Sequence, residues 1–157
     1  MADRSKVGME FPTYTMIVEK NKIAEFAMAV ALKEEKEGIN PIYYDEASAK
    51  KAGYQGIPAP PTFMASFFFW TVECLPEIVK ALSIDINRLL HSEEEYEYYG
   101  STYAGDTITR KMKVVEMYES GKRGRLGRFA EVTVLETEVI NQRGELIAKV
   151  RTTLMER

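Results

Sequence analysis

The chain has 157 residues, enough for one domain with a sizeable core and too few for two domains of ordinary size. Apolar residues make up 45% of the sequence and charged residues 29%, a balance typical of a folded globular chain. The formal net charge is −3, which argues against the basic surface of a nucleic-acid-binding protein. We therefore expect a single domain over residues 1–157 that binds no nucleic acid.

The sequence offers few ligands for a metal. Cys74 is the only cysteine and His91 the only histidine. These counts exclude a disulfide within the chain, a cysteine-clustered metal site and a metal site with two imidazoles. We therefore predict no metal. The first residues, Met1 to Lys6, are polar and lack the apolar run of a secretory signal, so we expect a cytoplasmic protein.

The first third of the chain predicts short elements. Residues 14–18 form a short strand candidate, and apolar residues at helical spacing over 23–31 predict an amphipathic helix that ends near Leu32. A second, short helix is predicted over 46–52, with Asp45 as its N-cap and a glycine just beyond its end.

The most apolar stretch runs from Ile57 to Leu75. Prolines and polar residues interrupt it, so it fails the requirement for about 18 or more uninterrupted apolar residues, and we expect no membrane span. Within it Phe63, Phe67 and Trp70 fall at i, i+4 and i+7, and other apolar residues fill the neighbouring face. The pattern predicts a buried helix that other elements wrap.

From Leu89 onward, apolar and polar residues alternate, which is typical of strands. Runs around 93–99, 112–114, 130–134 and 146–154 are separated by short connections at 103–106, 121–127 and 141–144. These connections predict an antiparallel meander. The fold class is therefore α+β, with strands long enough to curl around one apolar helix, as in a hotdog fold; another α+β sheet over a helix fits the periodicity equally.

Three segments carry a resemblance to a known family. They are NPIYYDEA (40–47), GYQGIPAPPTF (53–63) and LHSEEEY (90–96) followed by AGDT (104–107). In this order and spacing they resemble the MaoC-like dehydratases, in particular the N-terminal, FAS1-like branch. The resemblance covers about residues 14–157. It implies a hotdog domain that pairs with another hotdog and acts on 3-hydroxyacyl or 2-enoyl thioesters of coenzyme A or acyl carrier protein, without a metal or redox cofactor.

The resemblance also implies reversible hydration as the chemistry. At the two positions that carry this chemistry in the family, the sequence departs from the family pattern. Hydratase members use an Asp and a His from the pattern Asp-x-Asn-Pro-x-His. Aligning Asn40 and Pro41 with this pattern puts Gly38 at the Asp position and Tyr43 at the His position. Glycine has no side chain, and an unperturbed phenol with a pKa of about 10 is a poor base near neutral pH.

The family's oxyanion donor, a backbone N–H at the start of the long helix, is also altered. Here Ala59 is followed by Pro60 and a second proline, which lack an N–H. The following amides, of Thr62, Phe63 and Met64, are predicted to be free at the positive end of the helix dipole, a suitable place for a thioester carbonyl. The predicted substrate-binding residues are Asn40, Pro41, Ala59, Pro60, Thr62 and Phe63.

Three residues are candidates for catalysis in a variant site. His91 is expected to be a partly exposed strand histidine paired with a carboxylate, on the same side as Glu93 and the glutamates that alternate with it; the alternative is that it acts as the sole general base. Asp45 is foremost an N-cap, and it could act with Tyr43 only if both faced a pocket.

A basic loop follows the second strand run. Lys122, Arg123, Arg125 and Arg128 lie among three glycines in residues 121–128. The plain interpretation is a hairpin tip. The functional one is a docking site for the phosphates of coenzyme A or for an acidic carrier protein.

Three hypotheses about function follow. The resemblance to the non-catalytic subunit of heterodimeric (3R)-hydroxyacyl-ACP dehydratases favours a chain that binds the acyl thioester while a partner supplies the Asp–His dyad. The second is a self-sufficient (R)-specific dehydratase or enoyl hydratase, with a variant site around His91 and Tyr43. The third is a non-enzymatic small-ligand-binding hotdog protein. A homodimer and a heterodimer are both compatible with the sequence.

Overall fold

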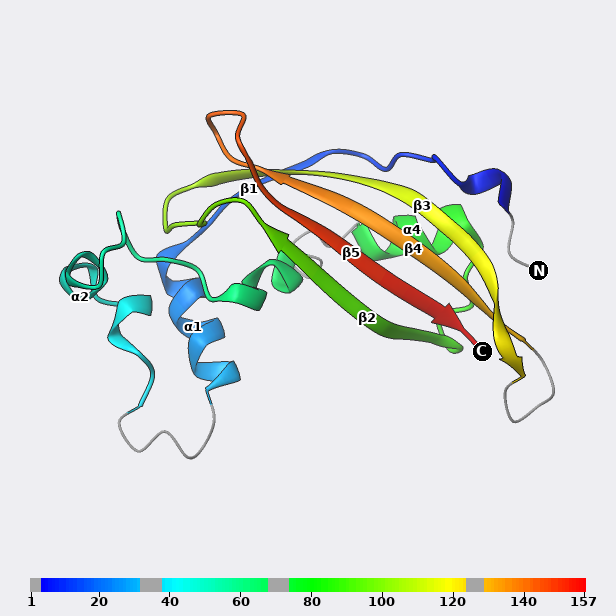
Figure 1. Cartoon of the computed structure of the whole chain (residues 1–157), viewed down its shortest axis with the longest axis horizontal. Coiled ribbons are helices and arrows are strands. Elements are labelled where there is room, and N and C mark those ends of the chain that lie inside the picture. Colours follow the sequence, from blue (N-terminus) through cyan, green and yellow to red (C-terminus); the bar gives the residue numbers. More distant parts are fainter. Residues whose placement is uncertain (1–3, 32–37, 68–73, 124–128) are drawn as a thin grey trace.

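A computed structural model describes residues 4–31, 38–67, 74–123 and 129–157 (Figure 1). Short 3₁₀ turns occur at Arg4–Lys6, Pro41–Tyr43 (η2) and Pro61–Ser66 (η3). The α-helices are α1 (Lys20–Val30), α2 (Glu46–Lys51) and α4 (Cys74–Leu82), and the strands are β1 (Tyr14–Ile17), β2 (Leu89–Tyr98), β3 (Thr107–Arg123), β4 (Phe129–Ile140) and β5 (Leu146–Glu156). The predicted α+β class is confirmed.

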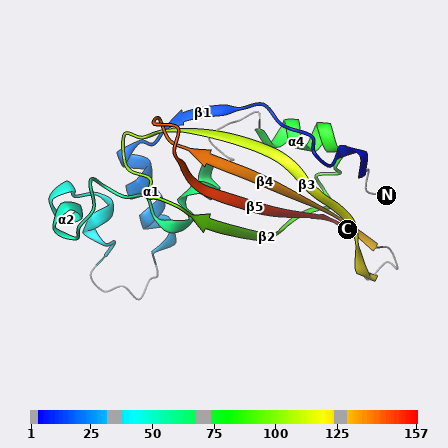
Figure 2. The ribbon, with the colours of Figure 1, turned by 45° about the horizontal axis from the view of Figure 1, so that its top comes forward.

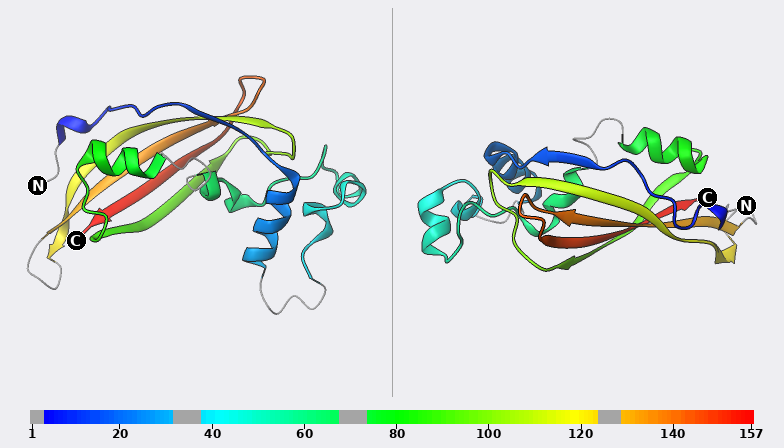
Figure 3. Two further views of the ribbon diagram at one scale, coloured as in Figure 1. Left: turned by 180° about the vertical axis from the view of Figure 1, so that it is seen from behind. Right: turned by 90° about the horizontal axis from the view of Figure 1, so that it is seen from above.

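The five described strands form one antiparallel sheet in the order β1-β3-β4-β5-β2. The helices α1 and α4 lie on the same side of this sheet (Figure 3). Helix α1 contributes Ile23 to a core cluster with residues of β3, β4 and β5, and α4 contributes Ile78 to a second cluster on the same face. Helices α1 and α2 lie at one end of the sheet, and the β3–β4 hairpin ends at the other (Figure 2).

The meander prediction is correct for β3, β4 and β5 and wrong for β2. Strand β2 pairs with β5, at the far edge from β1, and not with β3. The connecting segment 99–106 forms no hairpin because its backbone bonds elsewhere. Ala104 N donates to the Ile57 carbonyl at 2.9 Å, and Gly105 N donates to the Val18 carbonyl at 2.8 Å. This segment is a crossover, which short length alone does not reveal.

A β-bulge near the start of β2 changes which side chains share a face. His91 pairs with Leu154, and the register shifts between His91 and Glu93. Because Ser92 is an extra residue in the strand, His91 lies on the same face as Glu94. The expectation that His91 shares the side of Glu93 is therefore wrong.

The structure differs from the single buried helix that the sequence predicts within residues 57–75. Its first described part, η3, is a 3₁₀ helix, α4 continues to Leu82, and residues 68–73, with Trp70, lie outside the described residues. The side chains of Phe63 and Phe67 are fully buried, as predicted, and their rings meet edge to face at 5.7 Å. Phe63 also meets the ring of Phe26 on α1 at 5.4 Å. These contacts fix η3 against α1.

We expect Phe63→Ala to lower the free energy of unfolding by about 3–5 kcal/mol, because it removes a fully buried aromatic ring and leaves a cavity. Urea denaturation followed by circular dichroism measures this change. Phe129→Ala is the matched control, since Phe129 is 41% exposed and its loss should cost much less. Equal losses for the two variants would contradict the assignment of Phe63 to the core.

Candidate functional site

A cavity of about 230 Å³ lies beside the start of η3. It brings together Tyr43 of η2, Ala59 and Pro60 of the segment before η3, and residues of the crossover. The lining residues with the largest side chains are Tyr43, Tyr54, Tyr98, Pro58, Pro60, Pro61 and Met64. The described residues that line it include no carboxylate and no imidazole. The cavity can therefore bind an apolar group and donate hydrogen bonds from phenols.

The walls of this cavity are held by hydrogen bonds between distant segments. Ala59 N donates to the Thr102 carbonyl at 2.8 Å, and the Tyr98 hydroxyl donates to the Pro61 carbonyl. The Tyr98 ring stacks on that of Tyr96, with centroids 5.8 Å apart. Burial raises the pKa of both phenols above the ordinary value, so both stay protonated at neutral pH. Tyr98 is therefore not a base, and its proton is already donated to Pro61.

The start of η3 leaves fewer amides free than the sequence suggested. Phe63 N donates to the Pro60 carbonyl at 3.0 Å, because a 3₁₀ helix bonds each amide to the residue three positions earlier. The amide of Phe63 is thus occupied, and its side chain belongs to the core. Thr62 is exposed at the first turn, and its role in binding stays a prediction.

The residues at the two dyad positions have structural explanations. Gly38 is exposed and has a φ of +80°, which favours glycine. Asn40 caps η2, because its Oδ1 accepts a hydrogen bond from Ile42 N at 3.1 Å, and Pro41 is the first residue of this turn. Tyr43 is half-buried against the core cluster and lines the cavity. No acid–base pair is present at the two positions.

Asp45 is the N-cap of α2, as the sequence predicts. Its Oδ2 accepts a hydrogen bond from Ser48 N at 2.7 Å, and Gly53 beyond the helix has a φ of +92°. The hydrogen bonds from Ser48 lower the pKa of the Asp45 carboxyl below its ordinary value. Asp45 is therefore ionised at neutral pH and is unsuited to donate a proton, and it does not line the cavity.

His91 lies outside the cavity as well. Its Nε2 is 2.8 Å from Oε2 of Glu94, and its side chain is 56% exposed. The interpretation of His91 as a partly exposed strand histidine paired with a carboxylate is confirmed. The structure does not bring His91 and Tyr43 into one pocket.

The basic segment lies partly outside the described residues. Strand β3 continues to Arg123, which pairs with Phe129, so residues 121–123 are strand and not loop. Arg125 and Arg128 lie outside the described residues. The described end of β3 lies at the opposite end of the sheet from α2 and η2 (Figure 1). Lys122 and Arg123 are thus remote from the cavity beside η3 in the same chain.

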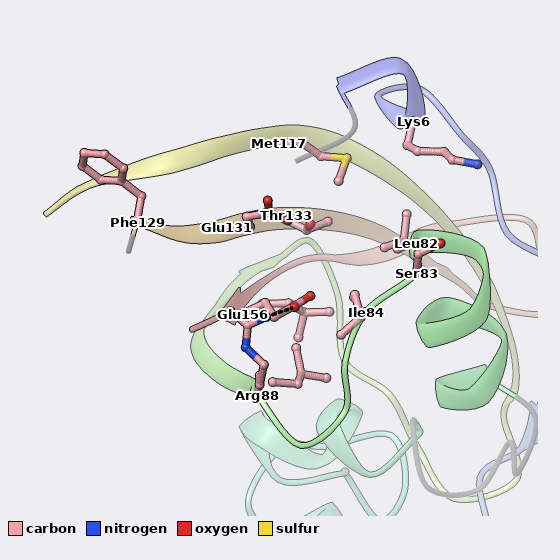
Figure 4. Close-up of a pocket in the computed structure, with 12 residues that line it drawn as sticks. Lys6, Leu82, Ser83, Ile84, Arg88, Met117, Phe129, Glu131, Thr133 and Glu156 are labelled. Atoms are coloured by element: carbon pink, nitrogen blue, oxygen red, sulfur yellow. Dashed lines mark ion pairs between the residues drawn. The ribbon is translucent and has the colours of Figure 1, made fainter. Parts of the chain in front are cut away.

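A second, larger concavity of about 410 Å³ lies between the end of α4, the start of β4 and the end of β5 (Figure 4). It combines apolar side chains with charges, and Arg88 Nη1 forms an ion pair with Glu156 Oε1 at 3.1 Å along its wall. Sequence reasoning missed it, because residues far apart in the chain build it and none belongs to a motif. No residue predicted to act in binding or catalysis lines it.

Two further observations concern the part of the chain that the structure describes. No group of three or more His, Cys, Asp or Glu side chains there is arranged to hold a metal ion. None of the helices found there is both long and apolar enough to cross a membrane.

Comparison with known proteins places this chain in a family. Residues 5–150 match the family described as "FAS1-like, dehydratase domain region". The chain belongs to this family. It is 30% identical to the UPF0336 protein of Saccharopolyspora erythraea over 149 residues, which cover 94% of this chain and 91% of that protein.

Two solved structures show the same fold. The C-terminally truncated HadBC (3R-hydroxyacyl-ACP dehydratase) complex of Mycobacterium tuberculosis superposes with a TM-score of 0.73 at 24% identity, over 96% of each chain. The (R)-hydratase of A. caviae involved in PHA biosynthesis superposes with a TM-score of 0.66 at 18% identity, over 98% of each chain. The hotdog fold and the resemblance to MaoC-like dehydratases are thereby confirmed.

We expect the N-cap carboxylate to stabilise the FAS1-like domain only above acidic pH. The pKa of Asp45 is lower in the folded chain than the ordinary value of 3.8, so its contribution is present above that value and lost as the pH falls through the folded pKa. Asp45→Asn keeps a capping oxygen and removes the titration. The melting temperature of the wild-type chain should exceed that of Asp45→Asn at pH 7, and the gap should narrow as the pH falls below 3.8. A gap independent of pH would contradict this role.

Proposed function

We propose that this chain is a subunit of a MaoC-like (R)-specific 3-hydroxyacyl-thioester dehydratase, or enoyl-thioester hydratase. In this proposal it binds the acyl thioester while a partner hotdog subunit supplies the Asp–His dyad. One observation carries the proposal: the cavity beside η3, where two of the three family motifs meet, is lined by phenols and prolines, and its described lining includes no carboxylate or imidazole.

The chemistry of hydration explains why this lining favours binding over catalysis. Water addition needs a base for the water and an acid near the substrate carbon. Gly38 offers no side chain, and the phenol of Tyr98 stays protonated at neutral pH. An apolar cavity with a few hydroxyl donors suits an acyl chain that ends in a thioester carbonyl. Such a site positions a substrate without converting it.

The partner is the second part of the proposal. The similar HadBC structure is a complex, and we extend this arrangement to the present chain. A homodimer would place two cavities of the same composition together and would still lack the dyad. The docking role of Lys122, Arg123, Arg125 and Arg128 toward coenzyme A or a carrier protein stays a prediction; because β3 ends far from the cavity, these residues would serve a substrate bound across the dimer.

We expect the purified chain alone to hydrate crotonyl-coenzyme A no faster than the buffer does, and to bind acyl-coenzyme A saturably, because the described lining of its cavity includes no acid–base pair. Loss of the enoyl absorbance measures the first property, and isothermal titration calorimetry measures the second. His91→Ala and Tyr43→Phe should leave the hydration rate at the background. Turnover that either substitution abolishes would establish the self-sufficient enzyme and overturn the proposal.

The cavity that binds the acyl group can be identified by filling it. Ser101 is exposed at the rim of the cavity beside η3, so Ser101→Trp should block entry and weaken acyl-coenzyme A binding by about tenfold or more. Ile84→Trp is the matched control in the larger concavity and should leave the dissociation constant unchanged. The reverse result would place the acyl group in the larger concavity. Unchanged dissociation constants in both variants would mean that neither concavity holds the acyl group, and no binding by the wild-type chain would favour a protein that has lost thioester binding.

A further inference from the structure

Strand β2 is an open edge of the sheet in the part of the chain that the structure describes. It has ten residues, and it lies at the outer border of the sheet in two views (Figures 1 and 3). The other border is formed by the four-residue strand β1 and, farther along β3, by residues before β1, with Gly8 N donating to the Val114 carbonyl at 2.8 Å and Phe11 N to the Met112 carbonyl at 2.9 Å. A long open edge is a template for the strand of another chain.

The face of the sheet turned away from the helices carries charges in rows across four strands. One row, from β2 to β3, consists of Glu95, Arg151, Glu136 and Lys113. The next row consists of Glu97, Lys149, Glu138 and Lys111. Signs alternate along each row, and Lys113 Nζ lies 3.0 Å from Glu136 Oε1. Opposite charges on directly paired residues stabilise a sheet.

Both rows end at the open edge in an exposed glutamate, and Glu93 adds a third on the same face. A strand that continued these rows would place a cation opposite each glutamate. A second copy of this chain would place glutamates, and not cations, opposite these glutamates. In an antiparallel two-fold pairing of β2 with itself, centred anywhere between Glu93 and Glu97, glutamates of one copy lie opposite glutamates of the other, which is destabilising.

We infer that the β2 edge pairs with an edge strand of a different chain, which carries Lys or Arg at alternate positions on the corresponding face. Glu93, Glu95 and Glu97 also disfavour pairing with a second copy of this chain, because like charges would then lie opposite one another. The inference deepens the proposed function, on which it rests for the existence of a partner, and it gives the chemistry by which that partner is selected.

A charge-reversed copy of this chain is the probe for the inference. The variant Glu93→Lys/Glu95→Lys/Glu97→Lys is mixed in equal amount with the wild-type chain, and sedimentation velocity at low ionic strength measures dimer formation. We expect the mixture to dimerise about tenfold or more tightly than the wild-type chain alone, since several facing pairs change from repulsion to attraction. Added salt should narrow this difference, because the side chains are exposed.

Two further variants keep the test decisive. The neutral variant Glu93→Gln/Glu95→Gln/Glu97→Gln should self-associate more tightly than the wild-type chain, because the repulsion is gone. The control Glu10→Lys/Glu19→Lys/Glu25→Lys makes the same change of net charge at exposed positions away from β2, and it should pair with the wild-type chain no better than the wild-type chain pairs with itself. Circular dichroism checks that every variant folds.

The inference would be overturned if the wild-type chain alone dimerised as tightly as the mixture, or if the control gave the same gain as the β2 variant. Neither result depends on a thioester, because no ligand is present in these measurements. Failure of acyl-coenzyme A binding would overturn the proposed function and leave this result standing, so that the two failures are distinguishable.

Discussion

The crossover from β2 to β3 is the constraint on which the rest of the structure depends. Its backbone bonds to the segment that leads into η3, with Ala59 N to the Thr102 carbonyl and Ala104 N to the Ile57 carbonyl. Because the crossover is tied there, β2 cannot fold back on β3 and lies at the far side of β5. The same bonds form a wall of the cavity and leave the β2 edge open. One set of backbone contacts thus produces both the candidate binding site and the candidate interface.

The cavity and the interface are adjacent. Tyr98 is the last residue of β2, and its hydroxyl donates to the Pro61 carbonyl at the start of η3. A strand paired with the β2 edge would therefore lie beside the cavity lining. A dyad supplied by a partner must reach the substrate from outside this chain, and the open edge is next to the place where the substrate would be held. The absence of acid–base groups from the described lining and the acidic edge then have a common explanation.

Local patterns in the sequence predicted local structure well. The period-2 runs became β3, β4 and β5, and the caps of α2 formed at Asp45 and Gly53, because those features depend on neighbours in the chain. The position of β2, the bulge at Ser92 and the 3₁₀ form of η3 depend on contacts between distant segments, which no local pattern encodes. The family motifs located the cavity at Tyr43 and Ala59, but they did not reveal that the Phe63 amide is occupied.

The acidic run in β2 shows why register matters to function. As sequence, the glutamates around Tyr96 are typical of a solvated strand face, and any strand with alternating charges would look the same. Only the pairing partners show that Arg151 stands between Glu95 and Glu136, and that the alternation ends at the edge with a carboxylate that has a neighbouring strand on one side only. A charge inside a row has an opposite charge on the strand at each side, whereas a charge at the end of a row has a strand on one side only and can pair with the strand of another chain. Position at the edge, more than residue type, makes these glutamates selective for a partner.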